Sequence, residues 1–146
     1  MNLMKRFRRG FTLIELMMVV VVLGILSSIA ATRYVDAMRK ANDGATKGNL
    51  GALRSALGIY YANMLSQYPQ NLALLDDNRA YINRVPMTVL RDYHADSNTS
   101  SEGAAAAVLT DGGGWSYVNA PTDANYGKVW INCSHTDAAG RVWTSY

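Results

Sequence analysis

The sequence has little of the chemistry that enzymes use. It holds one cysteine, Cys133, and two histidines, His94 and His135, in 146 residues. A single cysteine excludes an intramolecular disulfide, even for a domain that faces an oxidising compartment. No glycine-rich phosphate loop, His-Glu-x-x-His pair or nucleophile elbow is present. We therefore predict that the protein is not an enzyme.

Metal-binding patterns are also weak. Cys133, His135 and His94 can be drawn as three zinc ligands, but structural zinc sites usually have paired ligands at both ends of the site. The stretch Asp96 to Glu102 alternates oxygen side chains as a calcium loop does. It lacks the glycine at the sixth position and the acid at the twelfth, which excludes an EF-hand.

The charge is not that of a nucleic-acid-binding protein. The formal net charge of +3 comes from residues 1–10, which hold four basic groups and no acid, so the remainder carries 10 Lys+Arg against 11 Asp+Glu, a net −1. Further along, basic residues alternate with Asp36 and Asp43, which is typical of a solvated helix face. No nucleic-acid partner is predicted.

A long apolar run follows the basic residues. From Phe11 to Ala31 the only charged residue is Glu15. A helix of this length extends about 31 Å, which matches one hydrocarbon core. The positive charge ahead of the run predicts that residues 1–10 lie in the cytoplasm and that the C-terminal part lies outside.

Glu15 requires an explanation of its own. A carboxylate inside an apolar span costs about 2.5 to 3.5 kcal/mol and usually marks a paired or functional group. Cleavage between Gly10 and Phe11 would create an ammonium group four residues before Glu15. That group can meet Glu15 of the same chain or of a neighbouring copy. A plain signal anchor leaves Glu15 unexplained.

The stretch Gly10-Phe11-Thr12-Leu13-Ile14-Glu15-Leu16 resembles the processing motif of type IV pilins and of the pseudopilins of type II secretion. The resemblance implies that a prepilin peptidase cleaves after Gly10 and N-methylates Phe11. It also implies that the helix stays in the bacterial inner membrane until an assembly platform with an ATPase packs it into a filament with minor pilins or pseudopilins. Many pilins carry a proline about one turn past the apolar core, where this chain reads Ala30-Ala31-Thr32-Arg33.

Helical periodicity continues beyond the apolar run. Apolar side chains recur at helical spacing and predict one helix from Phe11 to about Leu65, ended by Tyr68-Pro69. The side chains of this stripe are Leu50, Leu53, Leu57, Tyr60 or Tyr61, and Met64. Four glycines weaken the helix. These glycines, Gly44, Gly48, Gly51 and Gly58, leave two alternatives open, fraying or close packing against neighbouring helices.

The remainder predicts one small domain. Leu72, Leu74 and Leu75 suggest a helical turn, residues 92–114 indicate a polar loop, and three stretches are typical of strands. The strands are expected at 115–118, 128–133 and 141–146, with Gly140 in a left-handed turn before the last. Val129, Ile131 and Val142 are expected to cover the apolar stripe of the helix.

The fold class is therefore α+β: a pilin fold with a long N-terminal helix packed on a small C-terminal antiparallel β-sheet. The expected divisions are a cleaved leader at 1–10, a transmembrane half of the helix at 11–31, an amphipathic half at 32–67 and a globular region at 68–146. The expected location is the inner membrane in a single pass, then a periplasmic or surface filament.

The main hypothesis is a structural subunit that polymerises through its N-terminal helix, with Glu15 neutralised by the Phe11 amine of an adjacent copy. The disulfide-free domain favours the major pseudopilin of a type II secretion system. One alternative is the major subunit of a type IV pilus, acting in adhesion, motility or DNA uptake. A second is a membrane-anchored binding module that recognises a ligand through residues 92–146.

No cofactor is predicted from the residues alone. The major pseudopilin family has a calcium site in its C-terminal loops, so the resemblance implies calcium as a possible ligand here. The candidate calcium ligands that the resemblance suggests are Asp92, Asp96, Asp111, Asp123 and Asp137.

Overall fold

A computed structural model describes residues 10–146. The predicted cytoplasmic leader, residues 1–10, lies outside the described residues except for Gly10. The chain divides into two compact units, of which the first ends at Met38 and the second is Arg39–Tyr146.

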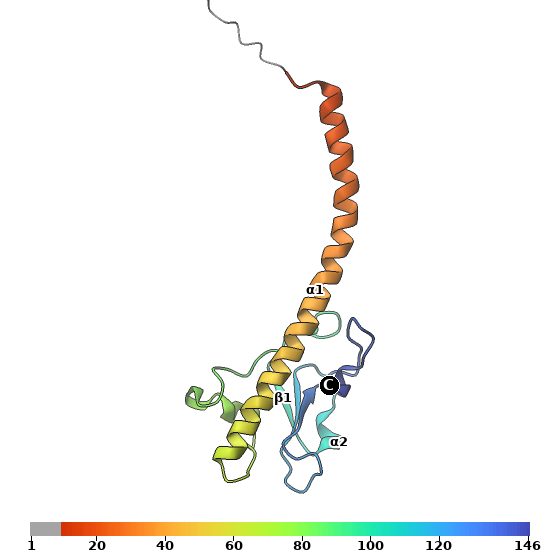
Figure 1. Cartoon of the computed structure of the whole chain (residues 1–146). Helices are drawn as coiled ribbons and strands as arrows, with labels where there is room; N and C mark the ends of the chain where they lie inside the picture. The colour runs from red at the N-terminus through yellow and green to blue at the C-terminus, as the bar shows by residue number, and fades with distance from the viewer. Residues whose placement is uncertain (1–9) are drawn as a thin grey trace, which may run out of the picture. The chain divides into compact units, whose positions relative to one another are not determined.

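One helix dominates the chain (Figure 1). Helix α1, Leu13–Asn63, is 51 residues long and continuous. This confirms the predicted long helix and shows that it does not fray at its glycines. A Cβ atom added at Gly44, Gly48, Gly51 or Gly58 would meet no atom within 4 Å, so packing within the chain does not require these glycines.

The helix ends slightly before the expected residue. Leu65 and Ser66 have φ angles of 50° and 67°, in the left-handed region that an α-helix cannot continue through. The backbone therefore leaves the helix before it reaches Tyr68 and Pro69.

The sheet has three short strands in the order β1-β2-β3. They are β1 Ser100–Gly103, β2 Trp115–Val118 and β3 Val129–Ile131. Strands β2 and β3 confirm two of the predicted strands, and they pair antiparallel. Strand β1 pairs parallel with β2, so the sheet is mixed and not wholly antiparallel.

The predicted polar loop at 92–114 is wrong in part, because it contains β1 and the short helix α2, Ala105–Val108. Strand β1 reads Ser-Ser-Glu-Gly and has none of the β-branched or aromatic residues that mark a strand. Its backbone pairing with the buried strand β2 forms it, and that tertiary contact leaves no mark in the local sequence.

The predicted last strand, 141–146, is wrong. Val142 makes only an isolated bridge with Thr136, and the chain then forms the 3-10 helix η3, Trp143–Ser145. Trp143 is buried in the core, whereas Val142, expected to face inward, is 39% exposed. A helical turn places the large indole in the core more deeply than an edge strand would. The predicted left-handed Gly140 is confirmed by its φ of 81°.

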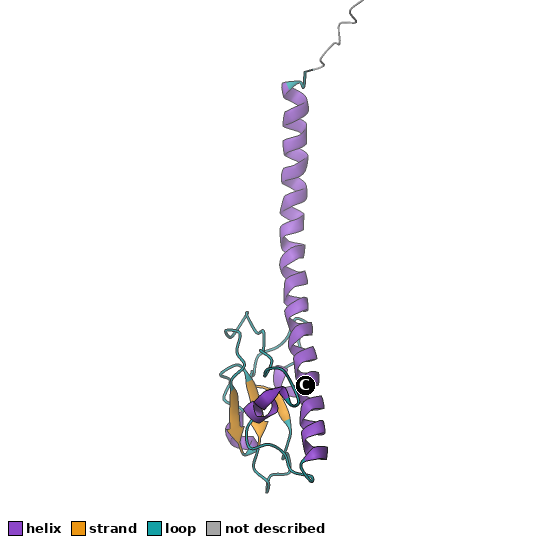
Figure 2. Cartoon of the chain, turned by 90° about the vertical axis from the view of Figure 1, so that its left-hand side faces the viewer, coloured by secondary structure: helices purple, strands orange, loops and turns teal. Residues whose placement is uncertain are grey.

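The core of the second unit lies between the C-terminal turns of α1 and the sheet (Figure 2). The predicted stripe supplies Leu50, Leu53 and Leu57, all buried. The sheet supplies Trp115, Tyr117, Val129 and Ile131, so the inward orientation expected for Val129 and Ile131 is confirmed. The predicted helical turn is the 3-10 helix η1, Leu72–Leu75, which buries Leu72 and Leu75 and precedes the 3-10 helix η2, Asp77–Arg79.

Candidate assembly segment and side-chain cluster

Residues 11–31 carry an apolar surface in which Glu15 is the only charged residue. Every residue from 11 to 38 is exposed in the chain, and Phe11 is 82% exposed. Among the described residues, α1 is one helix that is long and apolar enough to cross a membrane. Apolar surface of this extent requires a lipid or protein environment. The segment therefore fits a membrane-anchored protein.

Thr12 and Glu15 form the N-terminal cap of this helix. The Thr12 amide and hydroxyl donate to Oε2 of Glu15 at 3.0 and 2.8 Å. In return, the Glu15 amide donates to Oγ1 of Thr12 at 3.3 Å. This reciprocal pairing is a capping box, which satisfies amide donors that have no partner inside the helix.

The sequence interpretation above did not include Thr12 among the functional residues. The signal was present, because a Thr followed three residues later by Glu, just before an apolar run, is typical of a capping box.

Gly10 and Phe11 lie immediately before α1, and both are exposed. A Cβ atom at Gly10 would meet no atom within 4 Å, so the peptide bond between the two residues is open on the surface of the chain. An accessible, non-helical bond is what a peptidase requires. Cleavage at this bond and the roles given to Phe11 and Glu15 stay predictions.

The five aspartates named as calcium ligands do not gather at one place in the described part of the chain. Each has partners of its own: Asp92 pairs with Arg39, Asp96 with Arg91, Asp137 with Lys47, Asp123 accepts from the amides of Ala105 and Asn125, and Asp111 lies beside two histidines. Calcium binding stays a prediction.

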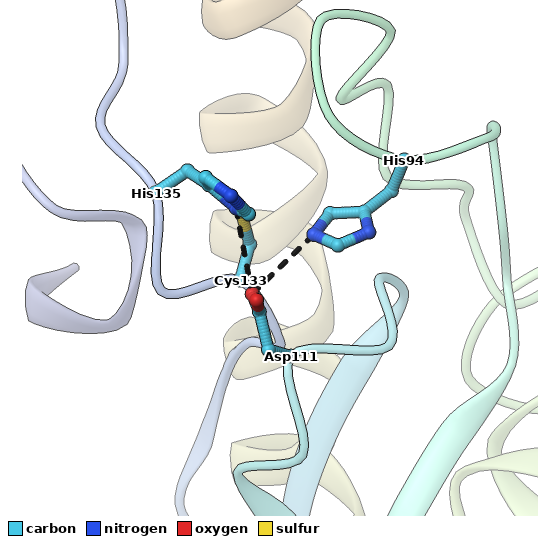
Figure 3. A group of neighbouring side chains, drawn as sticks. All are labelled: His94, Asp111, Cys133 and His135. Atoms are coloured by element: carbon cyan, nitrogen blue, oxygen red, sulfur yellow. Dashed lines mark hydrogen bonds and ion pairs between the residues drawn. The ribbon is translucent and has the colours of Figure 1, made fainter.

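A different set of side chains does come together (Figure 3). The potential metal-binding atoms of His94, Asp111, Cys133 and His135 all lie within 4.8 Å of one another. The Ser134 amide lowers the pKa of Asp111 by donating to its carboxylate, and the two histidines act in the same direction. Burial raises the pKa of the Cys133 thiol.

The sequence interpretation considered Cys133, His135 and His94 as a set and placed Asp111 in another. No local pattern joins the four residues, because they come from three separate loops. Their grouping depends on how the loops fold over the sheet.

Comparison with known protein families gives a match in the N-terminal segment. The family described as the prokaryotic N-terminal methylation motif matches residues 5–31. The chain is 47% identical to the type IV narrow pilus major component PilA5 of Thermus thermophilus over 51 residues, 35% of this chain and 44% of that protein. The N-terminal segment is therefore similar to that of type IV pilins and of type II secretion core proteins.

Relatives of a second kind also match. The chain is 38% identical to the type II secretion system core protein G of Dickeya chrysanthemi over 66 residues, 45% of this chain and 42% of that protein. With the same protein of Pseudomonas aeruginosa it shares 39% identity over 56 residues, 38% of this chain and 39% of that protein. The chain thus spans about two-fifths of the length of these pilin-family relatives. No solved structure matches it.

Proposed function

We propose that this pilin-family protein is a structural subunit of a filament, cleaved by a prepilin peptidase between Gly10 and Phe11 and assembled through α1. The observation that carries the proposal is the exposed apolar surface of residues 11–31, in which Glu15 is the single carboxylate. A surface of this kind serves twice, first in the bilayer and then against the helices of other copies. The role is structural and not catalytic.

Glu15 would have different partners in the bilayer and in the filament. In the chain, its carboxylate accepts two hydrogen bonds from Thr12. These bonds offset part of the cost of a carboxylate near apolar surroundings, which is about 2.5 to 3.5 kcal/mol at the centre of a membrane helix. An ammonium group at Phe11 of an adjacent copy, created by cleavage, supplies the missing opposite charge. This ion pair would favour one register between the α1 helices of adjacent copies.

Before assembly, the bilayer holds the first part of α1, with the basic leader in the cytoplasm and Arg39–Tyr146 outside. The unit Arg39–Tyr146 has its own core and is the part that a filament would display. Minor pilins or pseudopilins, an assembly platform and an ATPase are the partners of this pathway.

Within the family, the proposal is the major pseudopilin of a type II secretion system. Its support is the compact domain without a disulfide, in which Cys133 is free and buried, together with relatives named core protein G. The alternative is a type IV pilus major subunit, supported by the relatives named as pilus components. A deletion strain separates them: loss of exoprotein secretion supports the first, and loss of surface pili supports the second.

The assembly step is tested with two substitutions at one position. Glu15→Gln removes the charge but retains a side chain that can still cap the helix, whereas Glu15→Leu removes both. We expect both variants to insert in the membrane and to be cleaved after Gly10, yet to be lost from purified filaments. A matched control is Asp96→Asn, because Asp96 lies outside α1 and pairs with Arg91.

Wild-type amounts of Glu15→Gln and Glu15→Leu in filaments would contradict the proposed ion pair. A membrane-anchored binding module predicts this second result, since its helix acts only as a tether. The readouts are immunoblots of the membrane and of the sheared filament fraction.

A further inference from the structure

The cluster of His94, Asp111, Cys133 and His135 has no part in the proposed assembly. It lies in the unit Arg39–Tyr146, and its members come from three loops. His94 lies between Leu90 and β1, Asp111 lies between α2 and β2, and Cys133 and His135 follow β3. In Figure 3 the two imidazole rings, the thiol and the carboxylate point toward one region.

The two separations between an imidazole nitrogen and the carboxylate oxygen in the cluster are long for hydrogen bonds. Nε2 of His94 and Nδ1 of His135 lie 3.4 and 3.5 Å from Oδ1 of Asp111, and Sγ of Cys133 lies 3.5 Å from Nδ1 of His135. Hydrogen bonds between nitrogen and oxygen cluster at about 2.7 to 3.2 Å. Ligands at about 2.0 to 2.3 Å from a tetrahedral zinc ion are about 3.3 to 3.7 Å from each other. These three separations are those of ligands around a common centre, and the remaining pairs lie within 4.8 Å.

His94 supplies independent evidence. Its Nε2 atom is fully buried and has no hydrogen-bond partner among the described residues. The side chain as a whole is 16% exposed. A buried polar atom without a partner costs about 1 to 3 kcal/mol. Because Nε2 faces Oδ1 of Asp111 at 3.4 Å, a cation between the two atoms would satisfy both.

The surroundings hold two of the ligands, Asp111 and His135, in place. The Ser134 amide donates to Oδ1 of Asp111 at 2.7 Å, and Oδ1 of Asn132 accepts from the Asp111 amide at 3.0 Å. The Tyr93 ring stacks on His135 with the ring centroids 4.1 Å apart. Such supporting contacts are the rule at metal sites, where they orient the coordinating groups.

Gly113 makes room for His94. A Cβ atom at Gly113 would lie 3.0 Å from Cβ of His94, and the residue has a φ of 76°. Both observations require glycine at this position. The loop between α2 and β2 is thus shaped to let His94 approach Asp111.

We propose that His94 Nε2, Asp111 Oδ1, Cys133 Sγ and His135 Nδ1 bind one zinc ion. Two neutral imidazoles, one thiolate and one carboxylate carry a total charge of −2, which a divalent cation neutralises. Binding replaces the proton of the Cys133 thiol, which passes to solvent. Calcium and magnesium require six or more oxygen ligands, and this cluster offers one carboxylate, so it selects a borderline-soft metal.

The site joins three loops in a domain that has no disulfide. Metal binding to the folded state alone shifts the folding equilibrium toward that state. Zinc therefore takes the structural role that a covalent crosslink would fill in a small exported domain. This inference stands apart from the filament proposal, because it concerns the stability of the unit Arg39–Tyr146 and not the helix surface.

The test uses the full-length chain in detergent micelles, stripped with a chelator and then titrated with Zn²⁺ or with Co²⁺ as a coloured substitute. We expect one zinc per chain by elemental analysis and a rise in melting temperature of at least about 5 °C. The cobalt form should show the intense ligand-field bands of tetrahedral coordination and a thiolate-to-metal charge-transfer band. These spectra need no variant, so they are informative even if a substitution prevents folding.

Three variants complete the test. His94→Gln and Asp111→Asn should lower zinc affinity by more than about 100-fold, beyond the 10 to 100-fold typical of outer-shell residues. Asp96→Asn is the matched control, because Asp96 lies in the His94 loop and pairs only with Arg91. Its affinity should equal that of the wild type. Equal zinc binding in all four proteins, or a cobalt spectrum without thiolate coordination, would overturn the proposal.

Discussion

Thr12 and Glu15 cap one another at the start of α1, with the Thr12 hydroxyl 2.8 Å from the Glu15 carboxylate. The pairing fixes the first turn of the helix directly after the predicted cleavage bond. It also places the single carboxylate of the apolar segment at a defined position relative to Phe11. The carboxylate that caps the helix is thus the same one that the proposed assembly would pair with the Phe11 amine.

Replacing Thr12 with Val removes the hydroxyl while preserving its shape. Loss of an N-cap costs about 1 kcal/mol, which corresponds to about fivefold faster opening of the first turn. We expect the Glu15 amide, which donates to Oγ1 of Thr12, to exchange with deuterium about fivefold faster in micelles. Thr32→Val is the control, because its hydroxyl donates only to the Ile29 carbonyl in the middle of the helix. Equal exchange rates in both variants would exclude the capping role.

A buried carboxylate links α1 to the C-terminal loop. The side chain of Asp137 is fully buried and accepts from the Lys47 ammonium, from the Tyr146 hydroxyl at 2.6 Å and from the amides of Ala139 and Arg141. Asp137→Asn weakens the charged hydrogen bonds and should lower the free energy of unfolding by about 1.5 to 3 kcal/mol. Urea unfolding of the full chain in micelles measures the change.

Two further variants show whether this loss is specific to Asp137. Lys47→Met combined with Asp137→Asn in a double-mutant cycle should give a coupling energy of at least about 1 kcal/mol. Asp96→Asn, which breaks the more exposed pair with Arg91, should cost less than about 1 kcal/mol. Additive effects at Lys47 and Asp137 would show that the ion pair contributes nothing.

The same carboxylate predicts the direction of the pH dependence. Burial by itself raises the pKa of Asp137, but Lys47, Tyr146 and two backbone amides outweigh it and hold the pKa well below its ordinary value. A carboxyl with a lowered pKa in the folded state stabilises fully above its unfolded pKa of about 3.9, and this contribution is lost as the pH falls toward the folded value. In metal-free protein, the contribution of Asp137 should be level from about pH 7 to pH 5 and fall below about pH 4.

Asp123 adds to this slope, because the Ala105 and Asn125 amides lower its pKa as well. Urea midpoints between pH 7 and pH 3 should show a clearly smaller decrease for Asp137→Asn than for the wild type. An unchanged decrease would assign the acid sensitivity to other groups.

Substitution by alanine is expected to have opposite effects on stability at two glycines. A Cβ atom at Gly48 or at Gly140 would meet no atom within 4 Å, but Gly48 is helical whereas Gly140 has a φ of 81°. Gly48→Ala should therefore stabilise the chain by about 0.5 to 1 kcal/mol, and Gly140→Ala should destabilise it by about 1 to 2 kcal/mol. Thermal unfolding in micelles distinguishes the two, and a destabilised Gly48→Ala would reveal a contact of this glycine.

The parts of the fold that could be predicted are those with a local periodic signal. The apolar run and the stripe from Leu50 to Met64 mark α1, and the residues of β2 and β3 are apolar or aromatic enough to mark strands. Strand β1 could not be predicted, because Ser100–Gly103 becomes a strand only through its pairing with Trp115–Val118. Trp143 has strand character in sequence, yet burial of its indole places it in a 3-10 turn.

The two candidate sites also differ in whether a local sequence pattern marks them. Gly10, Phe11 and Glu15 are neighbours in the sequence, so their pattern can be interpreted without a structure. Strand β1 and helix α2 lie between His94 and Asp111 in the sequence, and strands β2 and β3 lie between Asp111 and Cys133. Only the folded arrangement of the loops brings them together. The short spacing between Cys133 and His135 marks them as candidate metal ligands, but no feature of the sequence adds Asp111 to this set.

The most direct test of the account is mass spectrometry of the mature N-terminus, in cells with and without a prepilin peptidase. The account predicts a chain that begins at N-methylated Phe11 when the peptidase is present and an uncleaved chain when it is absent. A chain that keeps its leader in both strains, or one that is cut beyond Glu15, would contradict the proposal that this protein enters a filament through its processed helix.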